Sequence, residues 1–154
     1  MCFECGLQVS GGRFLWLREL LCLARIEELG DCWMKDFRGL AVWKRAHSLV
    51  LDIYRLTEPF PKTELFGLTS QIRRAAASIP TNIAEGCGRD GDAELGRFLN
   101  IAKGSSSEVE YLLQLGCDLN YINLEMGGRL IQQTVDVRKM LYGLQKSLGA
   151  KNNG

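Results

Sequence analysis

The chain has 154 residues, the length of one domain of ordinary size. It contains 19 Lys and Arg against 18 Asp and Glu, and this net charge of +1 excludes a strongly basic nucleic-acid-binding domain on the whole-chain average. With 46% hydrophobic and 24% charged residues, the composition excludes a disordered chain and predicts a packed core.

Residues 1–33 differ in composition from the rest of the chain. They hold four of the six cysteines, and Cys2 and Cys5 have the spacing of one half of a zinc knuckle whose other half is missing. The apolar run at residues 14–24 is interrupted by charges, so it matches neither a signal peptide nor a membrane span. Two interpretations stay open: a short extension, amphipathic or disordered, or an upstream start codon with Met34 as the natural start.

From residue 40 onward, apolar residues recur every three or four positions, which predicts four helices. We expect the first helix at residues 40–57. The second starts near Thr63 as N-cap, and Pro80 kinks or interrupts it. Asp92 is expected to cap the third helix, and Asn123 starts the fourth.

The apolar stripes of these helices define the expected core. Because the connecting loops are short, the helices are expected to be antiparallel neighbours. The fold class is therefore all-α, an up-down four-helix bundle over residues 34–150 with a frayed tail at 151–154. The spacing also places four aromatic residues in the core rather than on a surface that stacks nucleobases, and it includes Leu65 and Leu119 in the stripes; the aromatic residues are Trp43, Tyr54, Phe98 and Tyr111.

A row of polar residues follows one side of the predicted second helix at spacings of three and four. One interpretation is an ordinary solvated face. The other is an interface between protomers, in which Arg74 and Glu85 pair across the contact. The row consists of Gln71, Arg74, Ser78, Asn82, Glu85 and Arg89.

Basic residues along the first three helices are candidates for contacts with nucleic-acid phosphates. No sequence signature of an RNA-binding domain accompanies them, so we expect recognition by charge and shape. The candidates are Lys44, Arg45, Arg73, Arg74, Arg89, Arg97 and Lys103, with Lys35 and Arg38 beside them.

An enzyme is the class of function that the sequence favours least. His47 is the single histidine, so neither a di-iron bundle nor a Ser-His-Asp arrangement can be assembled. The glycine-rich segment at 86–92 lacks the closing glutamate of a calcium loop and is explained by a turn between helices. We expect no catalytic residue, no cofactor and no metal, with Cys87 and Cys117 as reduced thiols.

Four motifs stand in order along the bundle: residues 37–46 (FRGLAVWKRA), 66–76 (FGLTSQIRRAA), 78–86 (SIPTNIAEG) and 98–105 (FLNIAKGS). Together they resemble the four-helix-bundle family encoded within intervening sequences of bacterial 23S ribosomal RNA genes. That family includes relatives of the accessory variability determinant of diversity-generating retroelements. The resemblance extends over about residues 35–148.

The resemblance implies a small cytoplasmic bundle that assembles into a ring, a homopentamer. In the retroelement relatives the ring binds nucleic acid and a reverse transcriptase. The implied partners are therefore further copies of the chain, RNA or DNA, and a reverse transcriptase where the gene is linked to a retroelement. No membrane partner is implied.

We thus expect a non-enzymatic oligomeric accessory protein that associates with RNA through basic residues. The alternative is an oligomeric scaffold that binds a protein and no nucleic acid. Charge favours the first, because residues 1–33 carry −2 and residues 34–154 carry +3, with 16 basic and 13 acidic residues. A pentamer of the bundle would carry about +15.

Overall fold

The structure, a computed structural model, describes residues 36–151, with side chains placed to residue 148. The interpretations given above for residues 1–33, and for the tail beyond Lys151, lie outside these residues. Four long helices follow a short 3-10 helix, and no strand occurs within the described residues, so the predicted all-α fold is confirmed. The elements in order are η1 (Phe37–Gly39), α2 (Ala41–Leu56), η2 (Lys62–Glu64), α3 (Leu68–Cys87), α4 (Gly91–Asp118) and α5 (Leu124–Lys151).

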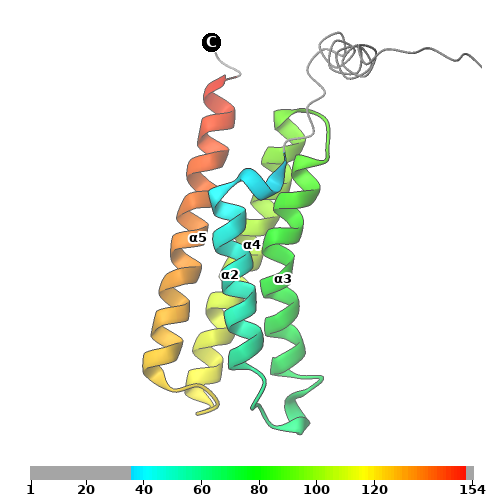
Figure 1. The fold of residues 1–154 in the computed structure, drawn as a ribbon. Helices are drawn as coiled ribbons and strands as arrows, with labels where there is room; N and C mark the ends of the chain where they lie inside the picture. The colour runs from blue at the N-terminus through cyan, green and yellow to red at the C-terminus, as the bar shows by residue number, and fades with distance from the viewer. Residues whose placement is uncertain (1–35, 152–154) are drawn as a thin grey trace, which may run out of the picture. The chain divides into compact units, whose positions relative to one another are not determined.

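The four helices run alternately up and down and pack around a common core (Figure 1). α3 packs on α4, α4 on α5, and α2 closes the bundle by packing on both α3 and α5. The start of α2, the end of α3, the start of α4 and the end of α5 therefore share one end of the bundle (Figure 1). None of the helices described is long and apolar enough to cross a membrane.

Aliphatic side chains at the predicted helical spacing fill the interior. Each helix contributes side chains that are fully buried, and burying one such side chain contributes about 1.5–3 kcal/mol to folding. The largest of these are Leu49 and Ile53 of α2, Ile72, Ile79 and Ile83 of α3, Leu99 and Leu113 of α4, and Leu130 and Leu141 of α5.

The start of α3 differs from the sequence prediction. Thr63 does not cap it, because Thr63 lies in η2 and α3 begins five residues later, at Leu68. A Glu64 carboxylate oxygen instead accepts a hydrogen bond from the backbone N–H of Leu68, at 3.0 Å. Leu65 falls in the connecting loop and is 51% exposed, so its expected place in the core was wrong. A carboxylate at a helix start satisfies an otherwise unpaired N–H and complements the helix dipole.

Of the other predicted helix starts, the one at Asn123 is confirmed and the one at Asp92 is wrong. α5 begins directly after Asn123, which confirms the predicted start, and the Asn123 side-chain oxygen caps the helix by accepting a hydrogen bond from the N–H of Met126 at 2.7 Å. Asp92 is not a cap, because α4 begins at Gly91 and Asp92 lies inside its first turn. α3 continues through Pro80 without a break.

Three further residues expected in the core are exposed. Tyr54 is 46% exposed, Tyr111 is 64% exposed and Leu119 is 47% exposed. Phe98 is buried as predicted, and Trp43 is half-buried against the core. The two tyrosines are tolerated at the edge of the apolar stripe of a helix, because a tyrosine hydroxyl remains in water while the ring covers apolar neighbours.

Candidate nucleic-acid interface

Charge is distributed unevenly along the bundle. We call residues 36–48, 78–104 and 138–148 the basic half, because they form the end where α2 begins and carry nine Lys and Arg against five Asp and Glu. The remaining residues, 49–77 and 105–137, form the acidic half and carry five Lys and Arg against eight Asp and Glu. Within the described residues, the bundle thus carries net positive charge toward one end of the helices and net negative charge toward the other.

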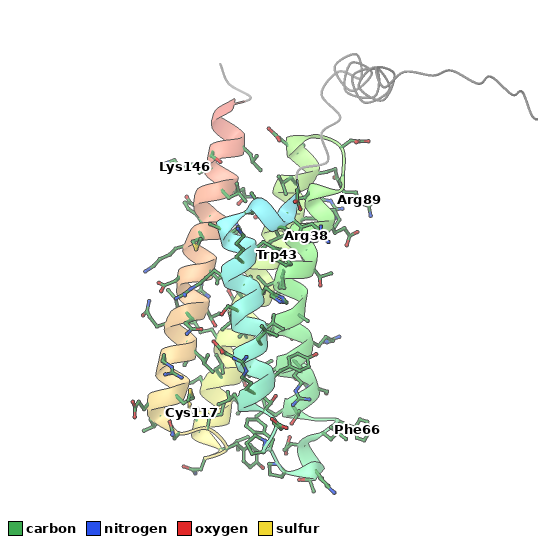
Figure 2. All side chains as sticks on the ribbon, viewed as in Figure 1. Arg38, Trp43, Phe66, Arg89, Cys117 and Lys146 are labelled. Atoms are coloured by element: carbon green, nitrogen blue, oxygen red, sulfur yellow. The ribbon has the colours of Figure 1, made fainter. Side chains whose placement is uncertain are left out.

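The structure places five of the seven candidate phosphate contacts in the basic half. Lys44 and Arg45 lie on the outer side of α2, and both side chains are exposed. Neither has an ion-pair partner within residues 36–151, and no acidic residue occurs between Phe37 and Leu51. Their charges therefore face solvent without local compensation. Figure 2 shows Arg38, Trp43 and Arg89 close to this same end of the bundle.

Arg89 and Arg97 flank the ring of Phe98, and each is paired with a glutamate. The Arg89 guanidinium donates to Glu85 at 2.7 Å, and its carbon lies 5.7 Å from the Phe98 ring centroid. Arg97 donates to both carboxylate oxygens of Glu94 at 3.0–3.3 Å and lies 4.3 Å from the same centroid. The hydrogen bond from Arg97 lowers the pKa of Glu94, and the same bond raises the pKa of Arg97. These two arginines are held in place, with their charges largely balanced.

Lys103 joins α4 to α5. Its ammonium donates to the Gln145 side-chain oxygen and lies 5.6 Å from the ring centroid of Tyr142. The Gln145 amide nitrogen donates in turn to the backbone carbonyl of Gly96 at 3.1 Å. Lys103 is therefore half-buried between two helices, with no carboxylate beside it among these contacts.

Arg73 and Arg74 lie in the acidic half, away from the other candidates. Arg73 donates to Thr57 Oγ1 at 2.7 Å and to the carbonyl of Tyr54 at 3.4 Å, so it ties the start of α3 to the end of α2. Its guanidinium also lies 4.8 Å from the Tyr54 ring centroid. Arg74 is exposed, and no ion pair within residues 36–151 involves it. Of these two neighbouring arginines, Arg73 thus links α3 to α2, whereas Arg74 is a charge on the surface.

The polar row of α3 is divided between the bundle and its surface. Ser78 Oγ lies 2.9 Å from Ser105 Oγ of α4, and Asn82 donates to the Ser78 carbonyl at 2.8 Å and to its hydroxyl at 3.0 Å. Ser78 and Asn82 therefore have partners in their own chain, at the seam between α3 and α4. Gln71, Arg74, Glu85 and Arg89 are the exposed members of the row.

One cluster escaped the sequence prediction. The rings of Trp43 and His47 are stacked, with centroids 5.1 Å apart and planes 5° from parallel. Phe37 extends this group, since its ring centroid lies 4.9 Å from that of Trp43, and Arg38 lies 4.5 Å from the Phe37 centroid. The four-residue spacing of Trp43 and His47 is the signal that could have revealed the pair, because such residues face each other on a helix.

The described residues offer no evident place for a metal. No group of three or more His, Cys, Asp or Glu side chains within them is arranged to hold an ion. Cys117 is buried in the core, and burial, followed by the neighbouring charge of Asp118, raises the pKa of its thiol. A thiol with a raised pKa is a poor metal ligand and a poor nucleophile at neutral pH.

Comparison with known proteins places the chain in a family. The model of the 23S rRNA-intervening sequence protein family matches residues 38–143. A solved structure with a similar fold is a protein of unknown function from the S23 ribosomal protein family of Bacteroides thetaiotaomicron VPI-5482. The two share 26% sequence identity with a TM-score of 0.62, over 68% of this chain and 98% of the other. No curated protein matches the chain. Because the family match covers more than half of its length, the chain belongs to the 23S rRNA-intervening sequence protein family.

Proposed function

We propose that this protein is a non-enzymatic, ring-forming accessory protein of the cytoplasm that binds RNA through the basic half of its bundle. One observation carries the proposal: Lys44 and Arg45 are exposed, without an ion-pair partner among residues 36–151, in the half of the bundle that has an excess of basic residues. Neutralising backbone phosphates with Lys and Arg releases condensed counterions, which is the main source of affinity in binding without sequence preference.

Assembly strengthens this argument. A single bundle presents only a few uncompensated positive charges, which gives a weak field. Cyclic symmetry repeats the same patch on every protomer, so a ring presents it several times within reach of one RNA. Each added contact then acts at a high effective concentration, and the affinity of the ring exceeds that of the protomer.

The test is a titration of fluorescein-labelled RNA, followed by fluorescence anisotropy, at several salt concentrations. In the Lys44→Glu/Arg45→Glu variant we expect weaker binding and a shallower dependence of log K on log salt. The slope should fall by about 1.4, since each lost contact to a single strand accounts for about 0.7. Lys62→Glu/Arg129→Glu is the matched control, because it changes the net charge equally but in the acidic half.

The control separates a local surface from a general charge effect. If the two double variants weaken binding equally, net charge alone governs the interaction and the basic half is not the site. If the wild-type protein binds no RNA even at low salt, RNA binding is rejected altogether.

A second candidate, a scaffold that binds a protein, is favoured by an apolar surface at the opposite end. Phe66, in the loop that joins α2 to α3, is 90% exposed, and Leu124, the first residue of α5, is 78% exposed. Phe66 projects away from the helices (Figure 2). The loops that join α2 to α3 and α4 to α5 are in contact, because the rings of Phe60 and Tyr121 lie 5.8 Å apart between centroids. If RNA binding is absent and a Phe66→Ser variant loses a protein partner that the wild type retains, the scaffold function replaces the first.

A further inference from the structure

We infer that the outer face of His47 is a stacking site for an unpaired base of single-stranded RNA. This inference rests on the proposed function and adds the chemical nature of the contact. It starts from the group formed by Phe37 of η1 with Trp43 and His47 of α2, in which successive rings are in contact.

The rings of Trp43 and His47 form an aromatic stack on α2. The two rings are 5° from parallel, with centroids 5.1 Å apart, so the indole packs in an offset stack against one face of the imidazole. His47 is exposed, whereas Trp43 is half-buried against the core, and its ring also contacts that of Phe37. The contact with the indole thus restricts the rotation of the imidazole. A ring restricted in this way loses little conformational entropy when a further ring stacks on it.

An exposed apolar side chain lies one helical turn beyond the exposed His47 ring. Leu51 stands four residues beyond His47, one helical turn further along the same side of α2, and is 44% exposed. Exposed apolar side chains next to an aromatic ring favour a ligand that is itself flat and apolar on its faces. A nucleobase has this character, because every base presents a π surface whatever its identity.

Two basic residues of α2 lie close to His47 in the sequence. Lys44 lies about 60° around the helix from His47, so its ammonium is within reach of the phosphate of a base stacked on the imidazole. Arg45 is its neighbour, and the stretch from Phe37 to Leu51 contains no acidic residue. An aromatic platform with cations beside it is the arrangement by which proteins hold single strands without reading their sequence. A second copy of this chain, which brings the same cations, would be repelled here.

A duplex cannot use such a site, since its bases are already stacked on one another. The stacking site therefore predicts a preference for single-stranded over double-stranded RNA. Phosphate contacts alone predict no such preference. A preference for single-stranded RNA therefore tests the stacking site separately from phosphate binding.

The experiment measures binding of a labelled 12-nucleotide single strand and of the corresponding duplex to the full-length chain by fluorescence anisotropy. Four proteins are compared: wild type, His47→Ala, His47→Phe and Ser48→Ala, the last as a matched exposed control on the same helix. We expect His47→Ala to weaken binding of the single strand by about fivefold or more, the lower limit for loss of one stacked base. Duplex binding should change by less than about twofold. His47→Phe should restore the affinity, and Ser48→Ala should match the wild type.

Each outcome has a definite meaning. If His47→Ala leaves single-strand binding unchanged, or weakens single strand and duplex equally, the stacking site is rejected while binding through Lys44 and Arg45 stands. The same conclusion follows if His47→Phe fails to recover the affinity although circular dichroism shows it folded. If the wild type binds neither RNA, the proposed function fails, and the stacking site fails with it.

Discussion

Buried hydroxyl groups in this bundle are paired with a backbone carbonyl in the preceding helical turn. Thr57 donates to the carbonyl of Ile53, and Thr134 donates to that of Leu130, both at 2.8 Å. Thr69 is the exception: it is 4% exposed, and its hydroxyl has no hydrogen-bond partner within the part of the chain that the structure describes. A buried hydroxyl without a partner costs about 1–3 kcal/mol relative to an apolar group of the same shape.

Thr69→Val should therefore stabilise the protein. Valine has the same branched shape, so the core stays packed while the unpaired hydroxyl is removed. We expect the free energy of unfolding to rise by about 1 kcal/mol, measured by urea denaturation with circular dichroism. Thr134→Val is the matched control, and it should gain nothing because that hydroxyl is already bonded. A Thr69→Val protein less stable than wild type would show that the hydroxyl contributes favourably.

Helices α3 and α4 make a close approach at Gly86. A Cβ atom added there would lie 2.9 Å from the Phe98 Cβ and 3.4 Å from the Leu95 Cα. Both atoms are close to the backbone of α4, so a side-chain rotation cannot relieve the contact. The glycine thereby sets how closely these helices approach near the basic end, where Arg89 and Arg97 flank Phe98.

Gly86→Ala should destabilise the bundle by about 1–3 kcal/mol, because α3 and α4 must separate to admit one methyl group. Gly104→Ala in α4 is the control. No atom lies within 4 Å of a Cβ added there, so alanine should stabilise that helix by up to about 1 kcal/mol. Thermal unfolding of both variants measures the contrast. Equal melting temperatures would show that the seam between α3 and α4 adjusts freely.

The periodicity of apolar residues was enough to predict the four helices and most of the core, because burial selects one face of a helix at every turn. It failed between α2 and α3. There a 3-10 turn and the carboxylate of Glu64 set the start of α3, and a loop contact of this kind has no period.

The candidate site was likewise predicted only in part from the sequence. The sequence identified the basic residues, but it could not tell that Arg73 clamps Thr57, sixteen positions away, while Arg74 stays free. Helical spacing gives the face on which a residue lies and not its partner on another helix. Ser78 and Ser105, twenty-seven positions apart, make the same point.

Arg74 and Glu85 of α3 remain the candidates for a contact between protomers. Arg74 has no ion-pair partner within residues 36–151, and Glu85, paired with Arg89 on its own helix, has a side chain that is 44% exposed. The neighbouring Ser78 and Asn82 are hydrogen-bonded to each other, and Ser78 also contacts α4, whereas Arg74 and Glu85 are among the exposed members of the row.

Arg74→Ala/Glu85→Ala should weaken assembly. Exposed ion pairs contribute about 0.2–1 kcal/mol each, so the protein concentration at half-dissociation should rise by up to about fivefold. Light scattering during size-exclusion chromatography measures the mass across a dilution series. Arg129→Ala/Glu125→Ala removes the same two residue types from α5 and should leave the mass unchanged. An unaltered dissociation curve for the first variant would place the interface elsewhere.

The opposite charges of the two halves have a consequence for ring assembly. In a ring whose symmetry axis runs along the helices, every basic half lies on the same rim, so like charges oppose closure most strongly at low ionic strength. A polyanion bound along that rim would cancel this repulsion. Ring closure and RNA binding would then be thermodynamically linked: each would strengthen the other by the same factor, because a coupling free energy is reciprocal.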